Sequence, residues 1–120
     1  MTDEPDRTPA RDPQDLERFL IARQWVGDID GMVALFEPNA VVDSGEGQLT
    51  RGREAIRTLF AEITATGRKF AAGEQRPALI NGDLALTSTK LPDGSITTEV
   101  ARRQDDGTWL WVIDRYSVAW

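Results

Sequence analysis

Apolar residues recur at helical spacing in the first half of the chain and at strand spacing in the second half. The helical stripes predict helices over 13–26, 29–37 and 52–66. Asp12 and Asp28 stand where an N-cap is needed before the first two helices. The first half therefore predicts three helices.

The second half alternates apolar and polar residues between turn signals. A short strand is expected at 40–43, followed by a flexible loop at 44–48. The later strands are expected at 70–75, 78–80, 84–91, 96–103 and 109–118. Asn-Gly or Asp-Gly pairs, which favour two-residue hairpin turns, follow Ile80, Pro92 and Asp105. Helices followed by an antiparallel meander predict an α+β fold.

The length of 120 residues fits one domain. Residues 1–12 are charged and proline-bearing without an apolar period, so they are expected to be a disordered lead-in to a single domain at 13–120. The sequence contains no cysteine and no histidine. This excludes thiol nucleophiles, disulfides and histidine relays and disfavours the usual metal sites, so acid–base chemistry must come from Asp, Glu, Lys or Tyr. We expect neither a metal nor a cofactor.

The net charge of −6 argues against binding to nucleic acid or to an anionic membrane, because both need a basic surface. A neutral, apolar or cationic small molecule fits this charge better. No apolar segment resembles a signal peptide or a membrane span. A cytoplasmic location is therefore expected.

The hairpin turns predict which side chains are neighbours. If the turns at Asp93-Gly94 and Asp106-Gly107 are both two-residue turns, Glu99 lies opposite Asp114 and next to Ser88. Beside this polar row would run a second one, composed of Lys90, Thr97 and Tyr116. The same register predicts an apolar floor on this face, formed by Leu84, Leu86, Ala101, Leu110 and Val112.

The opposite face of the last strand would then carry Trp109, Trp111 and Ile113. Such a large aromatic patch is not expected to face water. The sequence therefore predicts a homodimer that buries Trp109 and Trp111.

Glu99 and Asp114 are the strongest candidates for chemistry. Two carboxylates in a shared, partly dry site hold one proton between them, and one pKa rises. Glu99 would be the neutral acid and Asp114 the base, with Tyr116 or Lys90 polarising a substrate oxygen. The alternative is that this face is solvated and the two acids diverge.

Four segments together resemble the nuclear transport factor 2-like superfamily, and more narrowly its SnoaL-like and ketosteroid-isomerase-like branch. They are WVGDIDGMVALF at 25–36, AVVD at 40–43, GREAI at 52–56 and DGTWLWVIDRYS at 106–117. The resemblance implies a cone in which three N-terminal helices close a curved antiparallel sheet over an apolar pocket. It also implies dimerisation through the convex sheet face. It is weak for function, because the fold hosts isomerases, cyclases, hydrolases and binding modules.

Neither family catalytic set is complete in this chain. Where ketosteroid isomerases place a tyrosine on the first helix, the resemblance places Leu20, and their general base falls on Ser44, one residue after Asp43. Their oxyanion-hole acid corresponds to Glu99. Limonene-epoxide-hydrolase-like members pair two acids, similar to Glu99 and Asp114, with an arginine whose place holds Thr97.

The leading hypothesis is a cofactor-independent isomerase, cyclase or hydrolase that acts on an apolar substrate. Its catalytic residues would be Glu99, Asp114, Tyr116 and Asp43, although Asp43 could equally cap a turn. Its substrate-binding residues would be Trp25, Leu20, Ser44, Ser88, Lys90 and Val112. The alternative is a non-catalytic ligand-binding or protein-interaction module of the same fold.

Overall fold

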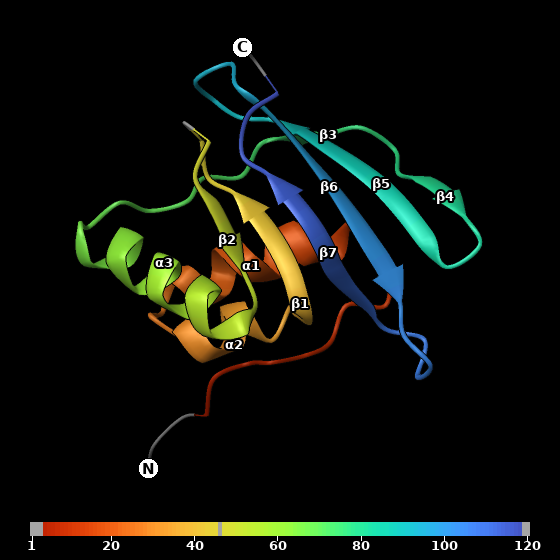
Figure 1. Cartoon of the computed structure of the whole chain (residues 1–120), viewed down its shortest axis with the longest axis horizontal. Helices are drawn as coiled ribbons and strands as arrows, with labels where there is room; N and C mark the ends of the chain where they lie inside the picture. Colours follow the sequence, from red (N-terminus) through yellow and green to blue (C-terminus); the bar gives the residue numbers. More distant parts are fainter. Residues whose placement is uncertain (1–3, 46, 119–120) are drawn as a thin grey trace.

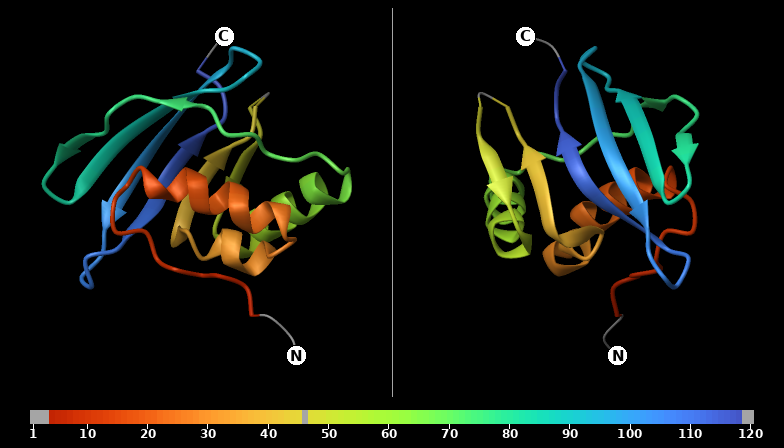
Figure 2. Two further views of the ribbon diagram at one scale, coloured as in Figure 1. Left: turned by 180° about the vertical axis from the view of Figure 1, so that it is seen from behind. Right: turned by 45° about the vertical axis from the view of Figure 1, so that its right-hand side comes forward.

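The computed structural model describes residues 4–45 and 47–118, which form three helices and a seven-stranded sheet. The helices are α1 (Asp15–Trp25), α2 (Ile29–Val33) and α3 (Arg53–Ala65). The strands are β1 (Phe36–Asp43), β2 (Leu49–Arg51), β3 (Glu74–Gln75), β4 (Leu79–Asn81), β5 (Leu84–Lys90), β6 (Ile96–Arg103) and β7 (Trp109–Arg115). All three helices lie against one face of the curved sheet, as expected for an α+β cone (Figures 1 and 2). No helix in the described part of the chain is long and apolar enough to cross a membrane.

The sheet is mixed, which corrects the expectation of a purely antiparallel one. Its strand order is β2-β1-β7-β6-β5-β3, with β4 also paired to β5, and β1 runs parallel to β7. Strand β1 begins at Phe36, inside the segment predicted to be helical, and its register against β7 shifts between Phe36 and Val41. Pro38 lies within this shift, where the irregularity accommodates a residue that lacks a backbone donor.

The β5–β6 turn is one residue longer than predicted. Leu91 N–H donates to the Ser95 carbonyl at 2.8 Å, which leaves a three-residue loop ending at Gly94 with φ of 89°. A left-handed glycine in the third position is typical of this loop type. Because the register moves by one residue, Thr87 rather than Ser88 pairs with Glu99. The predicted inner and outer faces of β5 are therefore exchanged.

The β6–β7 turn is also a three-residue loop, closed by Gln104 N–H on the Thr108 carbonyl at 2.7 Å. Here a β-bulge compensates for the extra residue. Ala101 pairs with Trp111 and Val100 pairs with Ile113, so Val112 is the additional residue. Beyond the bulge the predicted register returns.

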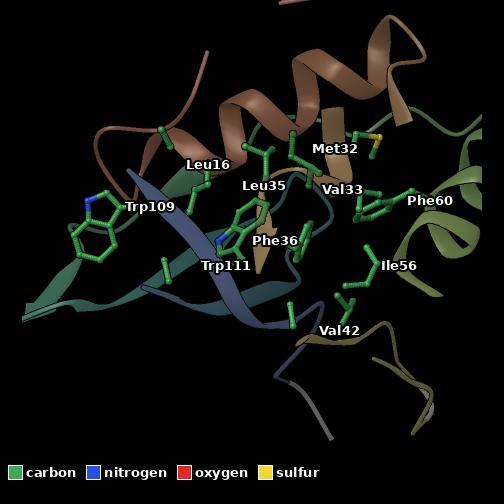
Figure 3. Packing of buried hydrophobic residues seen from close by; sticks show 14 of the residues in the cluster. Leu16, Met32, Val33, Leu35, Phe36, Val42, Ile56, Phe60, Trp109 and Trp111 are labelled. Carbon is green, nitrogen blue, oxygen red and sulfur yellow. The ribbon is translucent and has the colours of Figure 1, made fainter. Parts of the chain in front are cut away.

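Trp109 and Trp111 point into the core, which corrects their assignment to a dimer interface. Their exposed fractions are 5% and 3%. Trp111 packs against Phe36 with ring centroids 5.0 Å apart, and Phe36 packs in turn against Phe60 at 5.7 Å (Figure 3). The buried aromatic residues thus join the centre of the sheet to α3.

The N-terminal segment, which its composition suggested to be disordered, makes specific contacts with the domain. Ala10 is buried and pairs with Trp109, whose N–H donates to its carbonyl at 2.8 Å. Arg7 contacts both carboxylate oxygens of Asp28 at 2.7 and 3.0 Å. The buried Arg23 guanidinium donates to the Thr8 carbonyl at 2.7 Å.

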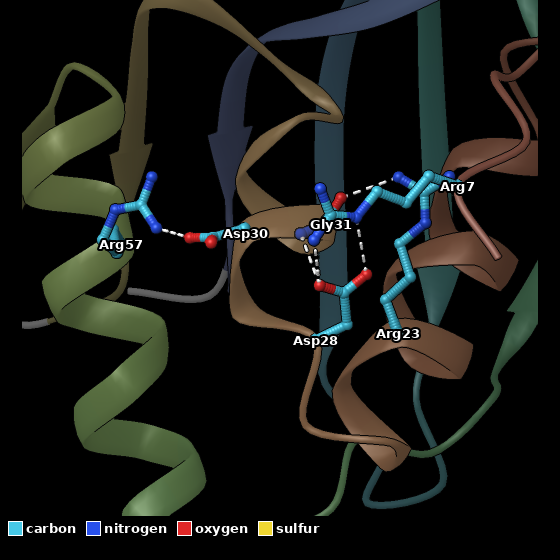
Figure 4. A network of polar contacts seen from close by, with 6 residues as sticks. All are labelled: Arg7, Arg23, Asp28, Asp30, Gly31 and Arg57. Atoms are coloured by element: carbon cyan, nitrogen blue, oxygen red, sulfur yellow. Dashed lines mark hydrogen bonds and ion pairs between the residues drawn. The ribbon is translucent and has the colours of Figure 1, made fainter. Parts of the chain in front are cut away.

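Asp28 has the capping role that the sequence predicts. Its carboxylate accepts a hydrogen bond from Gly31 N–H at 3.1 Å at the start of α2. The hydrogen bonds from Arg7, together with the Gly31 donor and the neighbouring guanidinium charges, hold the pKa of Asp28 below its ordinary value. On the same helix, Asp30 forms an ion pair with Arg57 of α3 (Figure 4). These contacts fix α2 between the N-terminal segment and α3.

Candidate functional site

A cavity of about 320 Å³ lies between α1, the inner face of the sheet and segment 68–71. Its buried lining, here called the floor, consists of Leu20, Glu99, Trp111 and Asp114. Its exposed lining, here called the mouth, consists of Arg68, Lys69, Ala71, Pro92 and Asp93. Half-buried residues between the two include Glu17, Ile21, Phe70, Leu91, Ser95, Thr97 and Tyr116. The volume is at the small end of the range for ligand sites.

Glu99 and Asp114 are cross-strand partners on the floor, as the sequence predicts. Burial raises the pKa of Glu99, while the hydroxyls of Thr97 and Thr87 oppose this by stabilising its charged form. Thr87 Oγ1 donates to Glu99 Oε1 at 2.7 Å. Burial raises the pKa of Asp114 well above its ordinary value, and the negative charges of Glu99 and Glu17 add to the effect. The two environments therefore bias Asp114 toward its neutral form more strongly than Glu99.

Glu17 is a third carboxyl group at this site, and the sequence analysis did not identify it as a site residue. It lies on α1, and its Oε2 accepts hydrogen bonds from Thr89 Oγ1 at 2.8 Å and Gln75 Nε2 at 3.0 Å. Glu17 stands three and four residues before Leu20 and Ile21, which also line the cavity. That helical spacing was the available signal. Thr89 could not be matched to it, because the predicted β5 register turned Thr89 outward.

Two polar atoms at the cavity have no hydrogen-bond partner among the described residues, Tyr116 Oη and Trp111 Nε1. Both atoms are buried, and an unpaired buried donor is rare in folded proteins. Burial raises the pKa of the Tyr116 phenol well above 10, and Asp114 adds to this while Arg68 opposes it. The phenol therefore stays protonated at neutral pH and can donate. Trp111 was missed by sequence reasoning because only the bulge at Val112 brings it to this face.

Leu20 lines the floor, whereas three other residues that were expected to bind substrate lie elsewhere. Ser88 and Lys90 are on the outer face of β5, since the three-residue turn exchanges the faces of that strand. Ser88 Oγ donates to the Thr97 carbonyl at 3.2 Å. Val112 is the bulged residue and does not line the cavity.

Asp43 and Ser44 also lie outside the cavity. The Asp43 carboxylate accepts a hydrogen bond from Gly45 N–H at 3.0 Å and pairs with Arg115 at 3.2 Å. Ser44 N–H donates to the Gln48 carbonyl across the same loop at 3.3 Å. Asp43 therefore has the turn-capping role that was its alternative interpretation.

Trp25 does not line the cavity and is 57% exposed. Its indole Nε1 donates to the Phe70 carbonyl at 2.7 Å. It therefore acts on the cavity through the segment that forms the mouth, which corrects its assignment as a direct binding residue.

The arrangement suits proton transfer. A pair of acids with separated environments can hold one proton and one available base, and two nearby donors can stabilise a developing negative charge on oxygen. Within residues 4–45 and 47–118, no group of three or more acidic side chains is arranged to hold a metal ion.

Comparisons with known proteins identify the fold. No protein-family model and no curated protein matches the chain. Among solved structures, an NTF2-like protein of unknown function from Pseudomonas putida has a TM-score of 0.63 at 19% identity, over 89% of this chain and 84% of that one. A ketosteroid isomerase-like protein from Erwinia carotovora has a TM-score of 0.66 at 12% identity, over 88% and 93%. A domain of unknown function with a cystatin-like fold from Nostoc punctiforme has a TM-score of 0.69 at 22% identity, over 88% and 74%.

These sequence identities are too low to carry a function from one protein to another. The TM-scores show that the architecture is shared. Together with the cone of three helices on a curved sheet, they confirm the resemblance at the level of structure: the chain has the fold of the nuclear transport factor 2-like superfamily.

Proposed function

We propose that this protein binds a small apolar molecule in the cavity and transfers a proton on it without a cofactor. The observation that carries the proposal is the buried pair of Glu99 and Asp114 beside two unpartnered donors, Tyr116 Oη and Trp111 Nε1. A ligand oxygen that reached either donor would supply the hydrogen-bond partner that it lacks. One of the similar structures is described as ketosteroid isomerase-like, which agrees with this class of chemistry.

The environments favour a division of roles opposite to that expected from the sequence. Asp114 is more strongly biased toward its neutral form, whereas the Thr87 hydroxyl stabilises ionised Glu99. Glu99 would then remove a proton from a carbon next to a substrate carbonyl. Tyr116 and Trp111 would donate to the carbonyl oxygen as it gains charge. Returning the same proton to another carbon of the substrate completes an isomerisation with no net change in protons.

The probe for this activity is cyclohex-3-enone, whose isomerisation gives the conjugated enone and a new ultraviolet absorbance. We expect turnover by the wild-type protein and a loss of about a hundredfold or more in Glu99→Gln, the range for removing a general base. Tyr116→Phe should lose about a hundredfold or more, as for removal of an oxyanion donor. Glu62→Gln, which changes an exposed carboxylate of α3, is the matched control and should retain the wild-type rate.

The second candidate is a non-catalytic binding module. The observation that favours it is that Leu20 lines the floor with an apolar side chain. The resemblance to ketosteroid isomerases places Leu20 at the helix position where those enzymes carry a tyrosine. Binding of cyclohex-3-enone without turnover, weakened by Tyr116→Phe, would support this function over the enzymatic one.

The proposed assembly is a homodimer through the outer face of the sheet. Leu86, Val100 and Ile113 form a cross-strand row on that face, and Leu86 and Ile113 are 45% and 50% exposed. This row replaces the buried tryptophans as the candidate interface. The cytoplasmic location stays a prediction from the sequence, in which no apolar segment resembles a signal peptide or a membrane span.

A further inference from the structure

The mouth of the cavity is built on a segment whose backbone is tied to α1. The side chain of Gln24, which is fully buried, donates from Nε2 to the Arg68 carbonyl at 2.7 Å. Its Oε1 accepts from Phe70 N–H at 2.8 Å. With the bond from Trp25 to the Phe70 carbonyl, three hydrogen bonds hold residues 68–70 in place.

Two cationic side chains extend from this fixed segment at the mouth. The Arg68 guanidinium lies 5.7 Å from the centre of the Phe70 ring, and Lys69 Nζ lies 5.7 Å from the centre of the Trp25 ring. Neither forms an ion pair within 4.0 Å with any described residue. Asp93 is also at the mouth, but Ser95 N–H and Oγ–H donate to its Oδ1 at 2.9 and 2.6 Å. Two cations therefore face one anion there, although the chain as a whole carries a charge of −6.

The floor has the opposite character. Glu99 and Asp114 are there, Glu17 also lines the cavity, and no cationic side chain lines the floor as defined above. An anionic group on a ligand would be repelled from this end and attracted to the other, because a like charge in a dry site is strongly unfavourable. The cavity should therefore attract an anionic group at its mouth and repel one at its floor.

We propose that the ligand is an amphipathic carboxylate, with its carboxylate at Arg68 and Lys69 and its apolar body extending toward Trp111 and Tyr116. The inference rests on the proposed function, since it assigns a substrate class to the same cavity. It gives a role to two entrance cations that have no ion-pair partner among the described residues, although Lys69 Nζ also donates to the Trp25 carbonyl at 3.5 Å. It also gives the substrate a single orientation, which presents the atoms farthest from the carboxylate to the acid pair.

The experiment compares two probes of equal shape, 2-naphthylacetate and its neutral isostere 2-naphthylacetamide, by titration calorimetry. The wild-type protein should bind the carboxylate about tenfold more tightly, and the preference should shrink as salt is raised because exposed charges are screened. In the double variant Arg68→Gln, Lys69→Gln the preference should disappear while amide affinity stays within about twofold. The control is Arg51→Gln with Arg76→Gln, which removes the same charge from exposed residues outside the cavity.

Equal binding of both probes, or a preference that survives the double variant, would overturn the carboxylate assignment and leave the proposed function standing. Failure of the neutral amide to bind the wild-type protein would overturn the proposed apolar site itself. The two results are distinguishable because Arg68 and Lys69 at the mouth should change only the ratio of carboxylate affinity to amide affinity.

Discussion

Glu99 and Asp114 lie directly opposite each other on β6 and β7, although the turn joining these strands has one residue more than the pairing requires. The bulge at Val112 absorbs that extra residue. The pairing of the two acids therefore depends on the longer turn and on the bulge, whose shifts in strand register cancel. Burial of both groups raises both of their pKa values, and the next three predictions test this effect.

Replacing Asp114 with asparagine should keep or raise stability at neutral pH by about 0.5–2 kcal/mol, while activity or binding falls. The pKa of Asp114 is raised in the folded protein, so folding is favoured fully below the unfolded pKa of about 3.9 and loses stability as pH rises toward the folded value. The gain should therefore be present near pH 7.5 and absent below about pH 4. Chemical denaturation at both pH values measures it, with Asp105→Asn on the exposed β6–β7 turn as control. Destabilisation at pH 7.5 would contradict the prediction.

Replacing Glu99 with glutamine should lower the pKa of Asp114, because one of the charges that raise it is removed. The pKa should nevertheless stay above its ordinary value, since burial is the larger cause. Carbon-13 NMR of the side-chain carboxyls measures both effects. If Glu99 and Asp114 in the wild-type protein both titrate near about 4, the pair is solvated and the acid–base proposal loses its physical basis.

Replacing Thr87 with valine should destabilise the protein by about 1 kcal/mol, the usual contribution of a buried hydrogen bond. It should also raise the pKa of Glu99 further, because the hydroxyl that donates to Oε1 stabilises the charged form. Thr89→Val is the matched control, since that hydroxyl donates to Glu17 instead. An equal shift of the Glu99 pKa in both variants would show that general burial, and not this bond, sets it.

Replacing Leu86 with glutamate should convert a dimer into a monomer with little loss of stability, because the side chain is on the outer face and 45% exposed. Sedimentation velocity at micromolar concentration measures the change. Val26→Glu, at the exposed end of α1, should leave assembly unaltered. Trp111→Glu should instead unfold the protein, since it would place a charge in the core. A monomeric wild-type protein would end the dimer proposal.

The sequence predicted the three helices, the order of the main strands and the central acid pair, because these depend on long periodic segments and on local turn signals. It missed the parallel pairing of β1 with β7, which joins segments far apart in the chain and leaves no local signal. It also predicted β1 too short, since Pro38 reads as a stop signal while the bulge in β1 tolerates it.

The site was predicted less completely for one physical reason. Asp-Gly pairs fit both two-residue and three-residue turns, and the choice between them exchanges the two faces of a strand. Ser88 and Lys90 were therefore assigned to the inner face of β5, which carries Thr87 and Thr89 instead. The role of Glu17 follows only once this register is known, and the inward position of Trp111 follows only once the bulge at Val112 is known.

The bulge at Val112 also decides how this chain can be aligned with proteins of the same fold. Removing or inserting one residue in β7 would exchange inner and outer positions on one side of the change, and so would move either Trp111 or Asp114 out of the cavity. A gapless alignment through the last strand can therefore match an inward residue of one protein to an outward residue of another. Gaps belong at this bulge and in the loops ending at Gly94 and Gly107, and ancestry inferred from site residues is meaningful only after they are placed there.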